Sequence, residues 1–265
     1  MNIVSLGYRT DLMLLTAQGS SIERRDGYRI VRTPDNPGYH WGNFLLLDAP
    51  LQPGTAAEWV RTFRGTFPAA EHLALGVDGT RGGAGDVAEL AGAGLGVQRS
   101  TVLTADELRP PPRPNRELGF RLLDGDADWR AALALREADN PGLDPASYRE
   151  YAERDLAAMR GLQERGLGGW FGAFEDGRMV SGLGVFTDGS GPARFQNILT
   201  HPAYRGRGLA GTLVHLAGTY ALAELGARLL VIVADPDYSA IRVYHSVGFA
   251  GTETQIQLAG VDLPS

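Results

Sequence analysis

The sequence lacks two residue types altogether, cysteine and lysine, over its 265 residues. Without cysteine the chain forms no disulfide, carries no thiolate nucleophile and builds no cysteine–zinc site. Without lysine it offers no lysine side chain of its own for acetylation, and all 25 basic residues are arginine. This bias is typical of a GC-rich bacterial genome and does not indicate a functional device.

Long apolar runs are also absent, since none reaches the ~20 residues of a membrane span. The start of the chain, MNIVS, lacks the basic residues and cleavage site of a secretory signal, so we expect a cytoplasmic protein with no membrane partner. The net charge of −6 argues against a nucleic-acid partner and is compatible with cationic substrates. The five histidines are scattered along the chain, so we expect no metal site.

Proline concentrates at one place in the chain. Four of the five positions in 110–114 are proline, which can continue neither a helix nor a central strand. We therefore predict a smaller α/β domain over residues 1–108, a stiff linker over residues 109–117, and a second domain over residues 118–265.

The second domain shows alternating strand and helix patterns. Helix 145–164 is predicted from Asp144 as its N-cap and Pro145 at its first position. The predicted order is strand 120–123, helices 127–137 and 145–164, strands 170–174, 179–186 and 194–200, helix 209–225, strand 228–234, helix 239–247 and strand 252–258. This order predicts an α/β (α+β) fold.

A glycine-rich loop, YRGRGLAGT at 204–212, lies between an apolar strand and a long helix. Such a loop exposes backbone N–H groups at a helix N-terminus, where the helix dipole also favours an anion. Gly206 and Gly208 allow the backbone to approach a phosphate without an intervening Cβ. Arg205 and Arg207 add positive charge. Taken alone, the loop fits equally well a turn that needs two glycines.

A second motif, DYSAIRVYHSVGF at 237–249, follows the next strand. With both motifs in this order, the chain resembles the GCN5-related N-acetyltransferases (GNAT superfamily) over roughly residues 119–260. The family's pyrophosphate loop, Arg/Gln-x-x-Gly-x-Gly/Ala, is matched by residues 205–210. Its later motif, Asn-x-x-Ala-x-x-x-Tyr-x-x-x-Gly-Phe, is matched except that Asp237 stands where asparagine is usual.

The resemblance implies the GNAT fold, a mixed central sheet flanked by helices, and acetyl-CoA as donor with CoA as product. It places Tyr244 beside the cofactor sulfur as the candidate catalytic acid; a core tyrosine on an amphipathic helix is the alternative. It also implies that the cofactor is bound by the end of one strand, the glycine-rich loop and the start of the second motif: Ile198, Leu199, Thr200, Arg205, Gly206, Arg207, Gly208, Leu209, Ala210, Gly211, Thr212 and Asp237.

The general base is not apparent. Many family members carry a glutamate where this chain has Asn197, and an amide accepts no proton usefully. Three interpretations stay open: a base elsewhere, a water chain, or an acceptor that arrives neutral. Glu175, Asp188 and Glu253 are acidic residues in plausible places, although each fits a turn or surface role better.

The N-terminal part shows a weak internal repeat of the C-terminal part at an offset of 154 residues, for which chance similarity is the alternative. Residues 51–56 then fall on the phosphate loop but contain no arginine, and Pro53 removes an N–H donor. Leu90 falls where Tyr244 would be. We therefore expect a degenerate GNAT-like half without its own site, which packs, forms a homodimer contact or shapes a substrate cleft.

Two functions remain open from the sequence. The first is an acetyl-CoA-dependent N-acetyltransferase that acts on an amine of a small molecule or peptide. The second is a non-catalytic acyl-CoA-binding or regulatory protein on the same fold, which Asn197 and the degenerate half suggest. A retained Tyr244 favours the enzyme.

Overall fold

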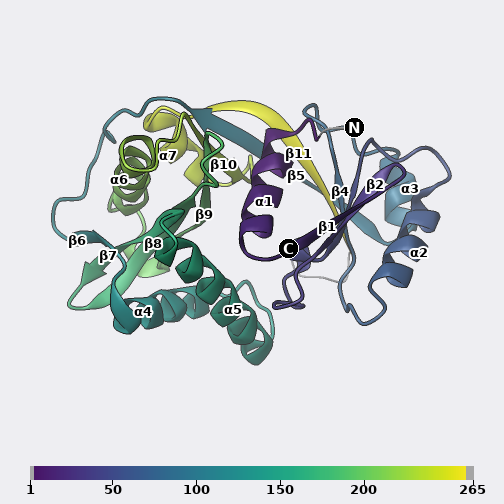
Figure 1. The fold of residues 1–265 in the computed structure, drawn as a ribbon. Helices are drawn as coiled ribbons and strands as arrows, with labels where there is room; N and C mark the ends of the chain where they lie inside the picture. Colours follow the sequence, from purple (N-terminus) through teal and green to yellow (C-terminus); the bar gives the residue numbers. More distant parts are fainter. Residues whose placement is uncertain (1–2, 261–265) are drawn as a thin grey trace. The chain divides into compact units, whose positions relative to one another are not determined.

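The computed structural model of the protein describes residues 3–260, and the chain divides into two compact units (Figure 1). The first unit runs up to Val102 and takes in the chain again from Thr252, whereas the second comprises Leu103–Gly251. Each unit consists of strands with helices packed on them. Within this described part of the chain, no helix is both long and apolar enough to cross a membrane.

The second unit is built on a mixed sheet, with strands in the spatial order β10-β9-β8-β7-β6. Neighbours from β6 to β9 pair antiparallel, and β10 runs parallel to β9. The strands are β6 (Gly119–Leu122), β7 (Gly168–Glu175), β8 (Arg178–Phe186), β9 (Pro192–Thr200) and β10 (Leu229–Ala234). This sheet confirms the expected fold class.

Helices cover both faces of this sheet (Figure 1). They are α4 (Gly125–Ala138), α5 (Pro145–Glu164), α6 (Leu209–Ala223), α7 (Ala240–Ser246) and the short 3₁₀ turn η2 (Pro202–Tyr204). Trp170 of β7 packs against Trp129 of α4, whereas its neighbour Phe171 packs against Tyr220 of α6. Successive strand residues point to opposite faces, so α4 and α6 lie on opposite sides of the sheet.

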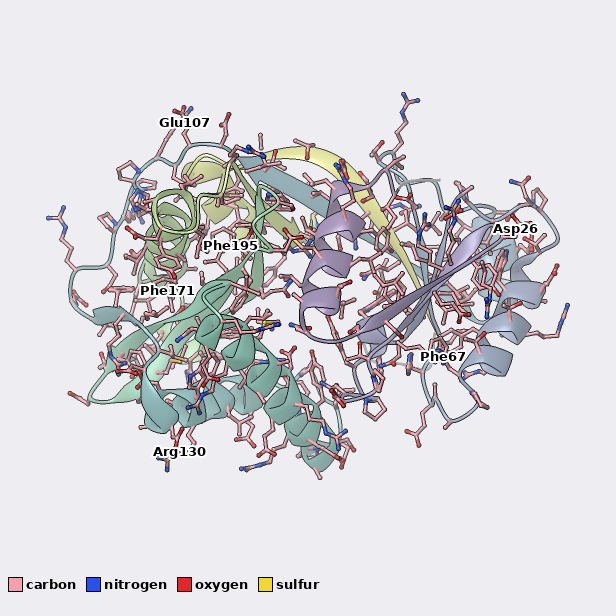
Figure 2. All side chains as sticks on the ribbon, viewed as in Figure 1. Asp26, Phe67, Glu107, Arg130, Phe171 and Phe195 are labelled. Atoms are coloured by element: carbon pink, nitrogen blue, oxygen red, sulfur yellow. The ribbon has the colours of Figure 1, made fainter. Side chains whose placement is uncertain are left out.

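Buried side chains of the strands and of α6 form the core that supports the later site. Phe171 and Phe195 belong to this core, together with Leu213 and Val214 of α6 (Figure 2). Phe195 also meets Phe249 edge to face, 5.8 Å between ring centroids. The end of the second motif is therefore fixed against strand β9, which lines the site.

Local sequence signals account for several element boundaries. The side chain of Asp144 accepts a hydrogen bond from the Ser147 N–H, and Pro145 is the first residue of α5, as expected. The β7–β8 hairpin turns at Asp176 and Gly177, which have φ values of 49° and 79°. Positive φ at both positions is the requirement of a type I′ hairpin turn.

The proline-rich segment belongs to the second unit and packs on it rather than spanning free. The Arg109 N–H donates to the carbonyl of Val247, and the Asn115 N–H donates to Oγ1 of Thr212 at 2.9 Å. The Asn115 side-chain amide donates to the carbonyl of Arg207. The sequence predicted a linker here because a run of prolines shows only the stiffness of the segment, whereas its packing partners lie ~100 residues away in the chain.

The first unit contains strands in the order β1-β2-β3-β4-β11-β5. Its elements are α1 (Leu6–Ala17), β1 (Ser21–Arg25), β2 (Tyr28–Arg32), the 3₁₀ turn η1 (His40–Gly42), β3 (Phe44–Leu47), α2 (Ala56–Thr66), β4 (Ala74–Val77), α3 (Val87–Gly92), β5 (Leu95–Ala105) and β11 (Ala250–Gly260). From β3 to β5 the order is strand, helix, strand, helix, strand, the order on which the proposed repeat rests.

The last strand belongs mainly to the first unit, which takes in the chain again from Thr252. The sequence-based domain boundaries had grouped this strand with residues 118–265. Strand β11 pairs antiparallel with β4, with Ile256 opposite Val77. The Leu6 N–H at the start of α1 donates to Glu253 at 2.8 Å, and the Tyr8 hydroxyl donates to the carbonyl of Ile256. Strands β4 and β11 pair across ~180 residues of the chain, and such pairing leaves no local sequence pattern. Composition therefore could not show that the last strand belongs to the first unit.

Two stacked histidines lie in the first unit. The rings of His40 and His72 lie 4.4 Å apart, and Nε2 of His72 donates to the carbonyl of Asn43 at 2.8 Å. Burial and the neighbouring His72 lower the pKa of His40 to about 4, and burial and Arg64 lower that of His72. Both shifts favour the neutral form of the ring in the folded state.

We expect the protein to lose about 1–2 kcal/mol of stability as the pH falls from 6.5 toward 4. The unfolded chain takes up protons first in this window, because its histidines have ordinary pKa values. Urea unfolding at a series of pH values measures the loss, and His40→Phe, which keeps the stacked ring, should reduce it. An unchanged pH dependence in the variant would refute this assignment.

Candidate active site

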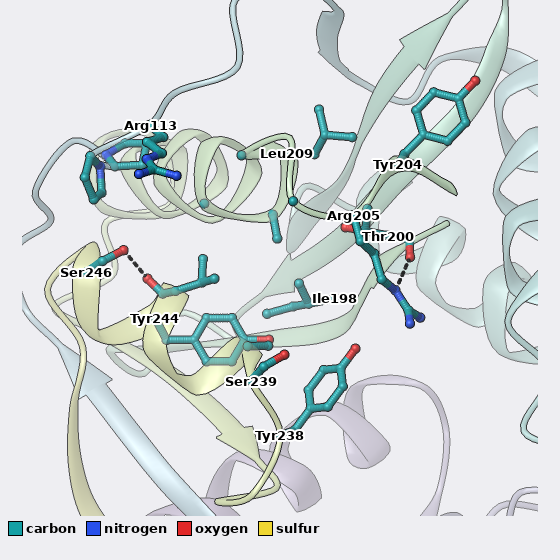
Figure 3. Close-up of a pocket in the computed structure, with 18 residues that line it drawn as sticks. Arg113, Ile198, Thr200, Tyr204, Arg205, Leu209, Tyr238, Ser239, Tyr244 and Ser246 are labelled. Carbon is teal, nitrogen blue, oxygen red and sulfur yellow. Dashed lines mark hydrogen bonds between the residues drawn. The ribbon is translucent and has the colours of Figure 1, made fainter. Parts of the chain in front are cut away.

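A cavity of about 370 Å³ lies in the second unit, where strand β9, the glycine-rich loop and α7 meet (Figure 3). Sequence-predicted residues that line it are Ile198, Thr200, Arg205, Gly206, Gly208, Leu209, Ala210, Gly211 and Tyr244. The four remaining predicted residues, Leu199, Arg207, Thr212 and Asp237, are not part of its lining. The structure thus brings most of the residues implied by the resemblance to one place.

The glycine-rich loop reaches α6 through two residues with left-handed backbone. Gly206 and Gly208 both have φ of 77°, a conformation that costs glycine little. A Cβ on Gly206 would meet nothing within 4 Å, whereas one on Gly208 would lie 2.2 Å from the carbonyl oxygen of Arg113. Gly206 therefore leaves room for a ligand, and Gly208 leaves room for the chain itself.

Helix α6 begins at Leu209, so its first-turn N–H groups have no acceptor within the helix. Those of Leu209, Ala210 and Gly211 belong to residues that line the cavity. Together with the helix dipole they favour an anion there. Thr212 serves the loop itself, since its hydroxyl donates to the Gly208 carbonyl and accepts the Asn115 N–H.

The two loop arginines have different surroundings. Arg205 lines the cavity; its guanidinium donates to the Thr200 carbonyl and pairs with Asp139 at 3.0 Å. Arg207 pairs instead with Glu117 at 3.1 Å and Glu175 at 3.5 Å. These pairs are at least partly open to solvent and are therefore weak, so a phosphate can displace a carboxylate from Arg205 at little cost.

Strand β9 bulges where it borders the cavity. Gly182 of β8 pairs with Leu199 and Gly184 pairs with Gln196, so Asn197 and Ile198 together face a single residue of β8. Asn197 has φ of 49°, a left-handed conformation that asparagine tolerates better than glutamate does. A bulge redirects backbone groups locally, and here the redirected residues include Ile198 of the cavity wall.

A buried ion pair holds the bulge. Arg136 of α4 and Asp155 of α5, about 4% and 5% exposed, pair at 2.8 Å, and the Asn197 side-chain amide donates to the same Asp155 oxygen at 3.2 Å. The residue at the family's usual base position is therefore an amide bound to a buried carboxylate. Asparagine at position 197 therefore has two structural reasons: it tolerates the left-handed backbone there, and its amide can donate to Asp155.

We expect Arg136→Met to lower the free energy of unfolding by about 3–5 kcal/mol, because it leaves the Asp155 charge buried without its partner. The double variant Arg136→Met/Asp155→Leu removes both charges and should recover most of the loss. Urea unfolding of the wild type, Arg136→Met, Asp155→Leu and the double variant measures the coupling energy between the two side chains. If the double variant lost as much free energy of unfolding as the two single variants together, the pair would be energetically unimportant.

Tyr244 on α7 is about 4% exposed and lines the cavity, with its ring directed toward Ile198 (Figure 3). Among residues 3–260 its hydroxyl has no hydrogen-bond partner. Burial, with a smaller contribution from Tyr238, raises the pKa of the Tyr244 phenol. The hydroxyl therefore keeps its proton at neutral pH and can donate it to a group in the cavity.

The other acidic candidates have structural roles. Glu175 accepts a hydrogen bond from the Tyr204 hydroxyl, which raises the pKa of Tyr204, and also pairs with Arg207. Asp188 accepts the Ser190 N–H in a turn, and Glu253 accepts the Leu6 N–H in the first unit. Asp237 is exposed, with its N–H bound to Asp235.

Sequence reasoning missed part of the cavity wall. Pro111, Pro112 and Arg113 line it, as do the second-motif residues Tyr238, Ser239, Ala240, Val243 and Ser246, and Tyr204 at the start of the loop. The second-motif residues could have been predicted from the sequence, because they lie between residues that match the family pattern. The proline segment carries no motif, and only its packing on α6 shows its place.

The first unit differs at the position that the proposed repeat would equate with the phosphate loop. There, the carboxylate of Glu89 on α3 accepts the N–H groups of Gly54 and Ala56, at 2.7 and 2.8 Å. An internal carboxylate thus binds the N–H groups that begin α2. The corresponding groups of α6 face a cavity instead.

Comparison with known proteins agrees with this geometry. Residues 129–249 match the family model described as "Acetyltransferase (GNAT) family". This part of the chain therefore forms a domain of the GNAT family. No curated protein sequence matches the chain.

Solved structures share the fold over nearly the whole chain at low sequence identity. A GCN5-related N-acetyltransferase from Kribbella flavida is 17% identical, with a TM-score of 0.66 over 97% of this chain and 96% of that one. A tandem GNAT protein from the clavulanic acid biosynthesis pathway is 18% identical, with a TM-score of 0.59 over 98% and 95%. A conserved protein of unknown function from Staphylococcus epidermidis is 12% identical, with a TM-score of 0.70 over 91% and 94%. The GNAT fold is thereby confirmed, and likeness to a tandem protein agrees with a GNAT-like first half.

Proposed function

We propose that the second unit is an acetyl-CoA-dependent N-acetyltransferase, which transfers an acetyl group to an amine of a small molecule or peptide and releases CoA. The observation that carries this proposal is one cavity lined by the glycine-rich loop, a bulged strand and a buried tyrosine whose hydroxyl has no partner within residues 3–260. Each of these three parts corresponds to one requirement of acyl transfer from a thioester.

The cavity fits the phosphate part of the donor. Gly206 leaves open space beside the loop, the first-turn N–H groups of α6 are unpaired within the helix, and Arg205 is charged and exposed. The volume of about 370 Å³ falls in the range of small-molecule sites. An elongated ligand with a pyrophosphate would therefore place that group at the N-terminus of α6.

The backbone of β9 supplies the second requirement. When bound, acetyl-CoA supplies the thioester, whose C–S bond breaks as the amine nitrogen forms an amide. Backbone N–H groups near Ile198 and Thr200 would orient the acyl group and donate to its carbonyl oxygen as negative charge develops. The bulge at Asn197, fixed by Asp155 and Arg136, holds these groups in position.

Tyr244 supplies the third requirement, a proton donor for the leaving sulfur. Its raised pKa keeps the phenol protonated throughout the neutral range, so the donor is present in every molecule of enzyme. With the Asn197 amide bound to Asp155, the strand position usual for a base offers no proton acceptor. We propose accordingly that the amine reaches the cavity in its neutral form, and that the proton it loses on becoming an amide is released to solvent, from which Tyr244 regains the proton it gave to the sulfur.

A second function is favoured by the same asparagine. A chain without a base at this position fits a protein that binds acyl-CoA and transfers nothing. Release of free CoA from acetyl-CoA, followed with a thiol reagent across a panel of amines, separates the two functions, and the absence of cysteine keeps the background low. Amine-dependent release supports the enzyme, whereas acetyl-CoA binding without release for any amine supports the binding protein.

A further inference from the structure

The proline-rich segment forms part of the cavity wall through Pro111, Pro112 and Arg113. Pro111 lies against α6, since a Cβ on Gly211 would be 3.3 Å from the Pro111 ring and 3.4 Å from Val243 of α7. The carbonyl of Arg113 lies against Gly208. The segment therefore packs on the start of α6 beside α7 and next to the loop.

Hydrogen bonds and prolines together fix the position of this wall. Asn115 donates through its backbone to Thr212 and through its side chain to the Arg207 carbonyl. Proline fixes φ at the positions on either side of Arg113, so little backbone freedom is lost when a ligand binds there. The wall is thus prearranged before any ligand arrives.

Arg113 is the charged residue of this wall. Arg113 is exposed and is one of the residues that line the cavity, and its side chain has no ion pair or hydrogen bond with any residue in 3–260. Arg205, by contrast, pairs with Asp139, and Arg207 pairs with Glu117 outside the lining. Arg113 therefore offers a guanidinium at the cavity without a competing carboxylate.

We propose that Arg113 binds the ribose 3′-phosphate of the acyl-CoA and so makes the site prefer CoA over its 3′-dephospho form. The inference rests on the proposed acyl-CoA site. The donor carries a pyrophosphate and, beyond it, a separate phosphate on the ribose. The loop and Arg205 serve the pyrophosphate, while Ile198 and Tyr244 line the acyl end. Arg113 lines the same cavity, and its carbonyl lies against Gly208 of the loop, so it is placed for the remaining phosphate, which its planar fork suits.

Calorimetric titration of the full chain with CoA and with 3′-dephospho-CoA tests this assignment. We expect the wild type to bind CoA about 5- to 20-fold more tightly, and Arg113→Gln to lose this preference by weakening CoA alone. Arg116→Gln is the matched control, since Arg116 is exposed, carries the same charge, and does not line the cavity. It should retain the preference.

An equal loss for both ligands in Arg113→Gln, or no loss for either, would overturn the inference and leave the acyl-CoA site in place. A loss of the preference in Arg116→Gln as large as in Arg113→Gln would also overturn it, because general charge would then explain the effect. A wild type that binds neither ligand would contradict the proposed function itself, and the inference would fail with it. Thermal unfolding of each variant confirms that the fold is retained.

Discussion

Gly206→Asp should weaken acetyl-CoA binding by about 100-fold or more. The carboxylate would stand within a few ångströms of the pyrophosphate, where like charges near a protein surface repel by about 4 kcal/mol at 4 Å. A Cβ at position 206 meets no protein atom within 4 Å, so the fold has room for the new side chain. The change therefore tests the anion site with little structural disturbance.

The matched control is Gly206→Asn, which has nearly the same shape, no charge, and a tolerance of the left-handed backbone at this position. We expect it to weaken binding by less than about 10-fold. Gly208→Asp is unsuitable, since its Cβ would collide with the Arg113 carbonyl. Equal affinities of the Asp and Asn variants, measured by calorimetry on folded protein, would remove the phosphate-binding role of the loop.

Tyr244→Phe should lower turnover by roughly 100-fold or more, the usual scale of a general acid's contribution. The ring and its packing are kept, and the hydroxyl makes no hydrogen bond within residues 3–260, so stability should change little. The Michaelis constant for acetyl-CoA should change far less than turnover, because the lost interaction belongs to the transition state. Steady-state kinetics with an amine found in the panel gives both constants.

Tyr238→Phe is the control for this variant. Tyr238 lines the same cavity but is about 51% exposed, and its hydroxyl is not assigned to the leaving group. It should retain turnover within a few-fold. Wild-type turnover in a folded Tyr244→Phe would make Tyr244 a core residue and leave the proton donor unassigned.

The parts of this site that the sequence predicted are those made by consecutive residues. The two positive-φ glycines, the start of α6 and the tyrosine of α7 are each encoded within a few positions. Their joint position was implied by the family resemblance. The cavity that contains most of the predicted residues could therefore be anticipated before any coordinates.

The parts that sequence reasoning did not reach depend on partners far along the chain. The bond between Asn197 and Asp155 joins residues 42 positions apart, so only the structure relates this asparagine to a buried ion pair. The pairing of β11 with β4 and the packing of Arg113 on Gly208 are longer-range still. Periodicity and turn signals describe local conformation and carry no information on such contacts.

The central claim is a single acetyl-CoA site, formed by the loop and cavity of the second unit. Native mass spectrometry of the full chain with acetyl-CoA tests it most directly. The account predicts one acetyl-CoA per chain in the wild type and none in Gly206→Asp, because Glu89 already binds the N–H groups that begin α2 in the first unit. No bound acetyl-CoA in the wild type, or two per chain, would contradict it.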